Sequence, residues 1–439
     1  MRVFERALAV VGNNVANVST PGYAKQGLTL VAKPFQPNIG LGGGVSAGDL
    51  ISFRNSYAEQ AVRNRQQTWG RYAQNAEDLA KVEAALPVTE DTGIPAALSR
   101  LFQGFSALAV TPNDSSARQV VLDRAADVAR NFNQTSALLQ QAATDAARRL
   151  DAMLGQINHL AETVRTVNWE RRQNFESVKD AGLDAQLHTA LEDLAELVNF
   201  TLLDQPDGTV TVLLGGQVPL VIGDSVHPLR LDTSGATPRV VNDQGHQLSG
   251  IATEGRLAAL VELTTKRLPS YIRDLDKLAE AVATVVNQGL RNGLDASGNP
   301  PTRDLFLFDP LAAAATLTVN DLSPGEIAAA AAGAPGGNRN ALAIADLAVA
   351  KTVDGGYTFA EYYGKIAGRA GRELAEARAN ESVSQLLVAQ ARTLRGQISG
   401  VNLDEEAARL VELQRSYQAA AKMFQAIDEM TRNILDLIR

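Results

Sequence analysis

The chain has 439 residues, of which 45% are hydrophobic and only 5% aromatic, and its formal net charge is −8. This acidic balance, without any dense block of Lys and Arg, excludes a general nucleic-acid binder. The absence of cysteine excludes disulfides, thiolate metal sites and cysteine nucleophiles. The length suffices for roughly two to four domains with real cores, and the few aromatic residues favour extended helices.

The N-terminal segment is predicted to be a short amphipathic helix. Residues 3–18 place apolar side chains at helical spacing, and Pro21 and Gly22 end the helix and turn the chain. Asn13, Asn14 and Asn17 interrupt the apolar character, so we expect no cleavable signal peptide here. No apolar run in the sequence is long enough to span a bilayer, and no membrane insertion is expected.

The glycine-rich stretch that follows is predicted to be a flexible joint. Gly42, Gly44 and Ala47 formally match the G-x-G-x-x-A pattern of a dinucleotide-binding loop. No strand is predicted before it, because Pro34 and Pro37 occupy the place where that strand would lie. We therefore expect a joint between a terminal rod and the next domain, without a phosphate site.

The middle of the chain is predicted to be helical with one inserted β unit. Helical spacing covers residues 53–86 and 94–110 and then a proline-free stretch from residue 113. A single helix of about 60 residues in this stretch would be about 90 Å long. Gly155 and Gly182 are the two places where we expect that this helix could break. From Phe200 the period changes to two, which predicts short antiparallel strands. Helix returns after residue 253 despite Pro269.

The C-terminal stretch is predicted to be a long helix with an apolar seam. Asn402 is a good N-cap, and Glu405 lies three residues on. A heptad register starting at Leu403 is sustained to the end, with Glu406 and Thr431 as its only polar members; the acidic run 404–406 is attributed to the helix dipole. The proposed assembly residues on this seam are Leu403, Leu410, Leu413, Tyr417, Phe424, Ile427, Ile434 and Ile438.

Together these elements predict a mainly α fold with a small β domain. The terminal helices pair as a coiled coil, and the middle is a helical bundle with an inserted antiparallel β unit. We expect six segments: a terminal rod segment that pairs with the C-terminus (1–50), a helical domain (51–199), a small antiparallel β domain (200–250), a helical return with an irregular insert (251–336), a return of the helical domain (337–399) and the C-terminal coiled-coil helix (400–439).

No residue pattern predicts catalysis. The histidines His159, His188, His227 and His246 are scattered, without an H-E-x-x-H or i, i+4 pair. The sequence contains no G-x-S-x-G, Walker A or calcium-loop pattern. We therefore expect no enzyme, no cofactor and no metal.

Both ends of the chain resemble the flagellar axial proteins, the family of rod, hook and hook-associated subunits. The stretch GNNVANVSTPGYAKQ is similar to the N-terminal signature of this family, and VNLDEEAARLVELQRSYQAAAKMFQAIDEMTRNILDLI is similar to its C-terminal signature. The N-terminal motif residues are Asn13, Asn14, Asn17, Thr20, Pro21, Gly22 and Tyr23. Between the ends, GGNRNALAIADL and TFAEYYGKIAGRAGRELAEA resemble hook-associated subunits. Family members usually begin further upstream than Arg2, so we expect a shortened helix or a misplaced start.

The resemblance implies a structural subunit that joins the hook to the filament. Its implied partners are further copies in a tubular layer, the hook protein, a second junction protein and an export chaperone on the C-terminal helix. The implied location is the flagellum, outside the cell, after type III export without a cleaved signal. A hook or rod subunit shares both end signatures and is one alternative. A generic coiled-coil adaptor is the other.

Overall fold

The computed structural model describes residues 2–34, 43–88, 92–232, 234, 239–248 and 250–437. These residues form two compact units, each assembled from separate stretches of sequence. The chain crosses between the units within helices α2, α4, α6 and α10. The first unit comprises residues 1–71, 153–258 and 382–439, and the second comprises residues 72–152 and 259–381.

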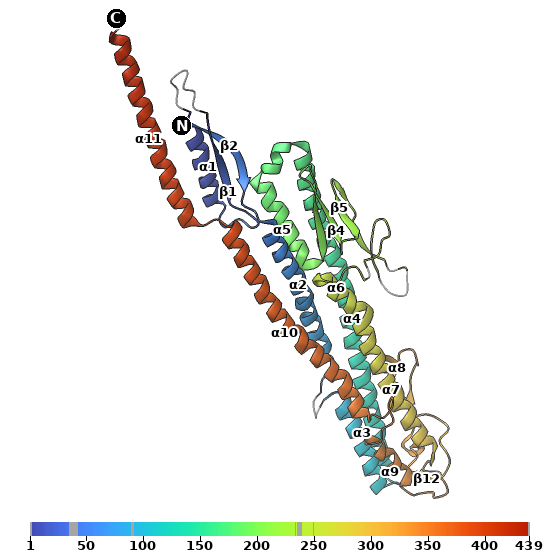
Figure 1. Ribbon diagram of the computed structural model, residues 1–439. Coiled ribbons are helices and arrows are strands. Elements are labelled where there is room, and N and C mark those ends of the chain that lie inside the picture. Colours follow the sequence, from blue (N-terminus) through green and yellow to red (C-terminus); the bar gives the residue numbers. More distant parts are fainter. Residues whose placement is uncertain are drawn as a thin grey trace. The chain divides into compact units, whose positions relative to one another are not determined.

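The fold is mainly helical, as predicted, with small antiparallel sheets (Figure 1). The α-helices are α1 Arg2–Ala16, α2 Ser56–Ala84, α3 Gly93–Val110, α4 Ser115–Gln173, α5 Ala181–Leu197, α6 Gly255–Glu262, α7 Leu268–Arg291, α8 Ala313–Thr316, α9 Arg339–Ala345, α10 Phe359–Ser399 and α11 Leu403–Leu437. Short 3₁₀ helices are η2 Phe175–Lys179, η4 Pro324–Glu326 and η5 Asp346–Ala348, and η3 Leu263–Arg267 is a π-helix.

The strands form two-stranded and four-stranded antiparallel sheets. In chain order they are β1 Gln26–Ala32, β2 Val45–Ser52, β3 Phe200–Asp204, β4 Val210–Leu214, β5 Val218–Ile222, β6 Ser225–Val226, β7 Leu229–Asp232, β8 Arg239–Asn242, β9 Gly293–Leu294, β10 Phe306–Leu307, β11 Thr318–Val319 and β12 Ala330–Ala331. The pairs are β1–β2, β3–β4–β5–β6, β7–β8, β9–β12 and β10–β11.

The long middle helix forms as predicted. Helix α4 has 59 residues, which correspond to about 90 Å at 1.5 Å per residue. Gly155 does not interrupt it; the break lies at residues 174–180, immediately before Gly182. There the carboxylate of Asp180 accepts hydrogen bonds from the amides of Gly182 and Leu183, 2.7 and 2.9 Å long, and so caps α5.

The β unit forms where the sequence period changes to two. Strands β3–β6 make one sheet, whereas the two weaker predicted strands pair separately as β7–β8. Buried Asn168 on α4 holds the first sheet: its side-chain amide donates to the carbonyl oxygens of Val210 and Gly223, and its Oδ1 accepts from the amide of Val210. One side chain thus satisfies sheet groups that the ladder leaves open.

The prediction that no strand precedes the glycine-rich stretch is wrong. Residues 26–32 and 45–52 pair as the antiparallel hairpin β1–β2. Because Val45–Ser52, which contains the end of the glycine-rich pattern, is a strand antiparallel to β1, this pattern does not open the helix of a dinucleotide-binding βαβ unit. Gly42 itself lies outside the described residues. Most side chains of β2 are exposed or half-buried, so the alternation that marks a strand was weak.

In the second unit, polar side chains attach an irregular segment to the helices. Buried Arg118 on α4 donates to the carbonyl oxygens of Gly325 and Ile327. Asn287 on α7 exchanges two hydrogen bonds with the backbone of Phe306. The helix continues through Pro269, as predicted, because the π-turn before it widens the backbone where the proline ring would otherwise clash.

Candidate functional site

The candidate site is the place where the two ends of the chain meet, all within the first unit. Helix α1 lies against α11 in the antiparallel sense (Figure 1, dark blue and red). Asn14, near the end of α1, contacts Glu406 at the start of α11, whereas the Tyr417 hydroxyl lies 3.4 Å from the Glu5 carboxylate near the start of α1. The predicted pairing of the terminal helices is therefore present.

The seam of α11 is covered over only part of its length. Leu410, Leu413 and Tyr417 are half-buried. The later seam residues Phe424, Ile427 and Ile434 are 60%, 54% and 58% exposed, and the first one, Leu403, is also exposed. The 15 residues of α1 span about 22 Å and the 35 residues of α11 about 52 Å, so α1 lies along only the first part of α11. The last proposed seam residue, Ile438, lies outside the described residues.

Asn14 is the centre of a buried polar cluster, which we call the polar hub: Asn14, Tyr23, Lys25, Gln26 and Glu406. The Asn14 side chain is fully buried. Its Nδ2 donates to the Gln26 carbonyl oxygen (2.9 Å) and to a Glu406 oxygen (3.0 Å). Its Oδ1 accepts from the Gln26 amide and from the Tyr23 hydroxyl, both at 2.9 Å. All four hydrogen-bonding positions of the side-chain amide are thus occupied.

Lys25 provides the positive charge of the hub. Its Nζ lies 2.9 Å from Glu405 and 3.1 Å from Glu406, whose side chain has no exposed surface. Burial opposes the charge of Lys25, but its hydrogen bonds to the two glutamates outweigh this effect and raise its pKa. Burial and the nearby Glu406 charge also raise the pKa of Tyr23 to about 12. At neutral pH, Lys25 is therefore charged and Tyr23 keeps the proton that it donates to Asn14.

The remaining motif residues shape the loop after α1. Asn17 donates to the backbone and side-chain oxygens of Asn13, and Thr20 donates to Asn17. Gly22 has a φ of +71°, and a Cβ at this position would lie 2.4 Å from the Ala185 carbonyl oxygen on α5. Glycine is therefore required both for its backbone conformation and for close approach to α5.

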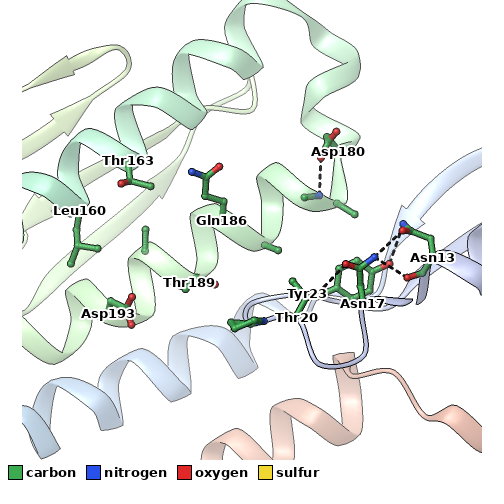
Figure 2. Close-up of a pocket in the computed structure, with 15 residues that line it drawn as sticks. Asn13, Asn17, Thr20, Tyr23, Leu160, Thr163, Asp180, Gln186, Thr189 and Asp193 are labelled. Carbon is green, nitrogen blue, oxygen red and sulfur yellow. Dashed lines mark hydrogen bonds between the residues drawn. The ribbon is translucent and has the colours of Figure 1, made fainter. Parts of the chain in front are cut away.

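A cavity of about 690 Å³ separates this loop from α4 and α5 (Figure 2). One side is lined by the motif residues Asn13, Asn17, Thr20, Pro21 and Tyr23. The opposite side is lined mostly by small and polar residues: Leu160, Thr163, Asp180, Ala181, Gly182, Ala185, Gln186, Thr189, Ala190 and Asp193. The N-terminal motif residues therefore gather at one place. They form a folded loop beside the cavity, whereas the C-terminal seam residues lie elsewhere, on α11.

A buried network of ion pairs connects the motif loop to the neighbouring helices. Arg54 binds Glu59 and Asp184, at 2.6 and 2.7 Å, and donates to the Gly22 carbonyl oxygen at 2.6 Å. Arg395 on α10 binds Glu59 and also Glu192 on α5. These contacts join the motif loop, α2, α5 and α10.

Lys25, Gln26, Arg54 and Glu406 also belong to the site, although no sequence pattern assigned them to it. The attribution of the acidic run 404–406 to the helix dipole alone is incomplete, because Glu406 is buried and bound to Asn14 and Lys25. One signal was available: Glu406 occupies a seam position that the heptad pattern reserves for apolar residues.

The histidines that the sequence analysis singled out do not gather at one place in the described ranges. Over those ranges, no three His, Asp or Glu side chains converge to hold an ion. His227 lies 3.1 Å from Asp243 and His246 lies beside Asn242, both at the edge of the β unit. His188 lies on α5, where arginines of other segments surround it, and His159 lies exposed on α4.

Comparison with known proteins places this geometry in a family. The family model of the flagellar hook-associated protein FlgK helical domain matches residues 79–306, more than half of the chain. The chain belongs to the FlgK family. Two further family models match its ends: the flagella basal body rod protein model at residues 3–23 and the flagellar basal body rod FlgEFG protein C-terminal model at residues 397–437. These two matches cover the motif loop and α11.

Relatives extend the FlgK match over the whole chain. Flagellar hook-associated protein 1 of Bacillus subtilis (strain 168) is 25% identical, with 98% of this chain and 95% of the relative covered. The protein of the same description from Escherichia coli (strain K12) is 19% identical, with 99% and 97% covered. The flagellar hook junction protein FlgK from Burkholderia pseudomallei has the same fold, with a TM-score of 0.70 over 78% of this chain and 100% of that structure at 15% identity. Across the described residues of this FlgK-family chain, no helix has both the length and the apolarity needed to cross a membrane.

Proposed function

We propose that this chain is a structural subunit of the bacterial flagellum that joins the hook to the filament. Membership of the FlgK family supports this proposal, together with one feature of the fold: α11 leaves half of its apolar seam uncovered. Phe424, Ile427 and Ile434 are each more than half exposed on this seam. Burying a side chain of this size contributes about 1.5–3 kcal/mol, so the uncovered half has a strong tendency to find a partner.

The partner that best fits the exposed half of α11 is a neighbouring copy of this chain. We infer that α11 of one copy packs on a different face of the next copy; such a contact is heterologous, and its repetition under screw symmetry builds an open tubular array. The hook protein would lie at one edge of this array and a second junction protein at the other. Before assembly, an export chaperone would cover the same seam. The subunit would act on the flagellum outside the cell, and its role would be mechanical rather than catalytic.

The alternatives have less support. A hook or rod subunit usually has a β-rich middle, whereas residues 56–173 here are largely helical and the FlgK helical-domain model matches residues 79–306. A generic coiled-coil adaptor would not be needed for filament growth. Deleting the gene separates these functions: we expect cells with hooks and no filaments.

The direct test is the variant Phe424→Asp. It adds a charge to the exposed seam, so we expect stable protein that no longer attaches at the hook tip. The matched control is Gln425→Asp, which adds the same charge one residue away, off the seam heptad. Both proteins should unfold at the parent temperature, because Phe424 is 60% exposed.

Electron microscopy of complemented deletion cells gives the readout. We expect filaments with Gln425→Asp and bare hooks with Phe424→Asp. Normal filaments with Phe424→Asp would exclude the exposed seam as the assembly surface.

A further inference from the structure

The polar hub contains a charge in a place where the helix pairing calls for an apolar side chain. Glu406 lies on the α11 seam and has no exposed surface. Removing a carboxylate from water costs several kcal/mol unless it is paired and hydrogen-bonded. An apolar residue at this position would cover the seam at lower cost. The presence of Glu406 therefore calls for an explanation other than stability.

The pairing of Glu406 is specific to one alignment of the two helices. One Glu406 oxygen accepts from Asn14 Nδ2 at 3.0 Å, and the other lies 3.1 Å from Lys25 Nζ. Asn14 in turn is held by two backbone bonds to Gln26 and by the Tyr23 hydroxyl. The Asn14 side chain thus cannot follow Glu406 if α11 moves. The backbone of Lys25 is also held in place, because its amide donates to the Ser399 carbonyl oxygen at the end of α10.

The apolar part of the seam does not distinguish between alignments. Its residues repeat every seven positions, so a slide of α11 by one heptad, about 10 Å, would replace one apolar contact by another. The same slide would place Leu413 opposite Asn14. The Asn14 side-chain amide would then be buried without its Glu406 acceptor, and the Lys25 ammonium would lose both of its carboxylate partners.

We propose that Asn14, Lys25 and Glu406 are positioning residues that fix the register of α11 against α1. This inference rests on the proposed function, since a repeating array requires every copy to present Phe424 to Ile434 at the same height. A slide of one heptad would displace that surface by about 10 Å and mismatch it with its neighbours. Asn14 belongs to the N-terminal motif, and its bond to Glu406 gives this motif residue a role in aligning the two ends of the chain.

The test measures register in the full-length monomer. The native chain has no cysteine, so spin labels can be placed cleanly at exposed Arg6 on α1 and exposed Gln418 on α11. Double electron–electron resonance should give one narrow distance with the native hub. In the triple variant Asn14→Leu, Lys25→Met, Glu406→Leu we expect a second, longer distance population, because α11 can then slide by about 10 Å along α1, while the helices stay folded and thermal stability is kept.

The conservative variant Glu406→Gln is the matched control. It keeps an acceptor for Asn14 and should retain the single narrow distance. An unchanged single distance in the triple variant would overturn the proposal. Complete loss of a defined distance would overturn it as well, because the polar residues would then merely hold the ends together. The measurement uses isolated monomers, so its failure is distinct from failure of Phe424→Asp to prevent hook capping.

Discussion

At the scale of single residues, backbone shape and buried charge decide how this site is built. Gly22 combines a positive φ with close contact to α5. His188 on the same helix is surrounded by Arg54, Arg63, Arg171 and Arg395. The close contact of Gly22 and the charged surroundings of His188 do not follow from the residue types alone, because both depend on which segments the fold places next to these residues. Each leads to a measurable prediction.

Gly22→Ala should destabilise the first unit by more than about 1 kcal/mol, because alanine is strained at φ +71° and its Cβ would approach the Ala185 carbonyl oxygen to 2.4 Å. The matched control is Gly12→Ala. Gly12 is exposed on α1 with no atom within 4 Å of a Cβ, so alanine should stabilise the helix by about 0.5–1 kcal/mol. Urea unfolding of both variants gives the comparison. Equal effects of the two substitutions would contradict the role of the motif glycine.

His188 should make the protein sensitive to acid. Burial, followed by the charges of the four surrounding arginines, lowers the pKa of His188 to about 2. The nearest acid is Asp184, at 3.7 Å. Between pH 6.5 and about 2 the unfolded chain therefore binds a proton that the folded chain does not, so stability falls as the pH drops below 6.5.

We expect this single histidine to contribute a slope of up to about 1.4 kcal/mol per pH unit in that window. Urea unfolding of wild-type protein and of His188→Gln, at several pH values from neutral to acid, measures it. The variant should show the shallower dependence. An identical dependence in the two proteins would mean that His188 is protonated in the folded state.

At the scale of elements, α11 is one helix with two environments. Its first half packs on α1 through Leu410, Leu413 and Tyr417, whereas residues from 423 onward are exposed. Isolated helices are marginally stable in water because nucleation is costly. The two halves should therefore differ in stability although their sequence pattern is the same.

Amide exchange in the monomer should become faster along α11. We expect slow exchange for residues 406–421 and fast exchange for residues 423–435, because only the first stretch has tertiary contacts. In assembled flagella both stretches should be protected. Mass spectrometry of peptides from each half measures this gradient. Uniformly strong protection along the whole helix in the monomer would exclude folding coupled to assembly.

At the scale of the whole molecule, the net charge of −8 sets how copies approach one another. Like-charged copies repel at low ionic strength, where charges act over about 30 Å at 0.01 M salt, and much less near 1 M salt, where the distance is about 3 Å. Contact through the apolar seam of α11 is not weakened by such screening. Association between copies should therefore increase with salt.

Sedimentation velocity of the purified chain at about 0.01 M and about 1 M sodium chloride tests this expectation. We expect larger species at high salt, and fewer of them with Phe424→Asp. The control Gln425→Asp should follow the wild-type protein. Association that weakens as salt rises would indicate that ion pairs, rather than the seam, hold copies together.

The sequence by itself determined the elements whose signal is local. The long helix α4, the strands after Phe200 and the seam of α11 each show a period that can be read within a few turns or residues. The hairpin β1–β2 escaped prediction because most side chains of β2 are exposed or half-buried, which weakens the alternation, and because prolines and glycines separate the strands.

Only the tertiary structure decided what the polar residues do. Asn14 and Glu406 are 392 positions apart, so no local pattern could pair them. Folding places both at the meeting point of the chain's ends, where each one is excluded from water and must bind the other. The same holds for the seam: its period is uniform along α11, and only the tertiary structure shows that its first half packs against α1 while its second half is exposed.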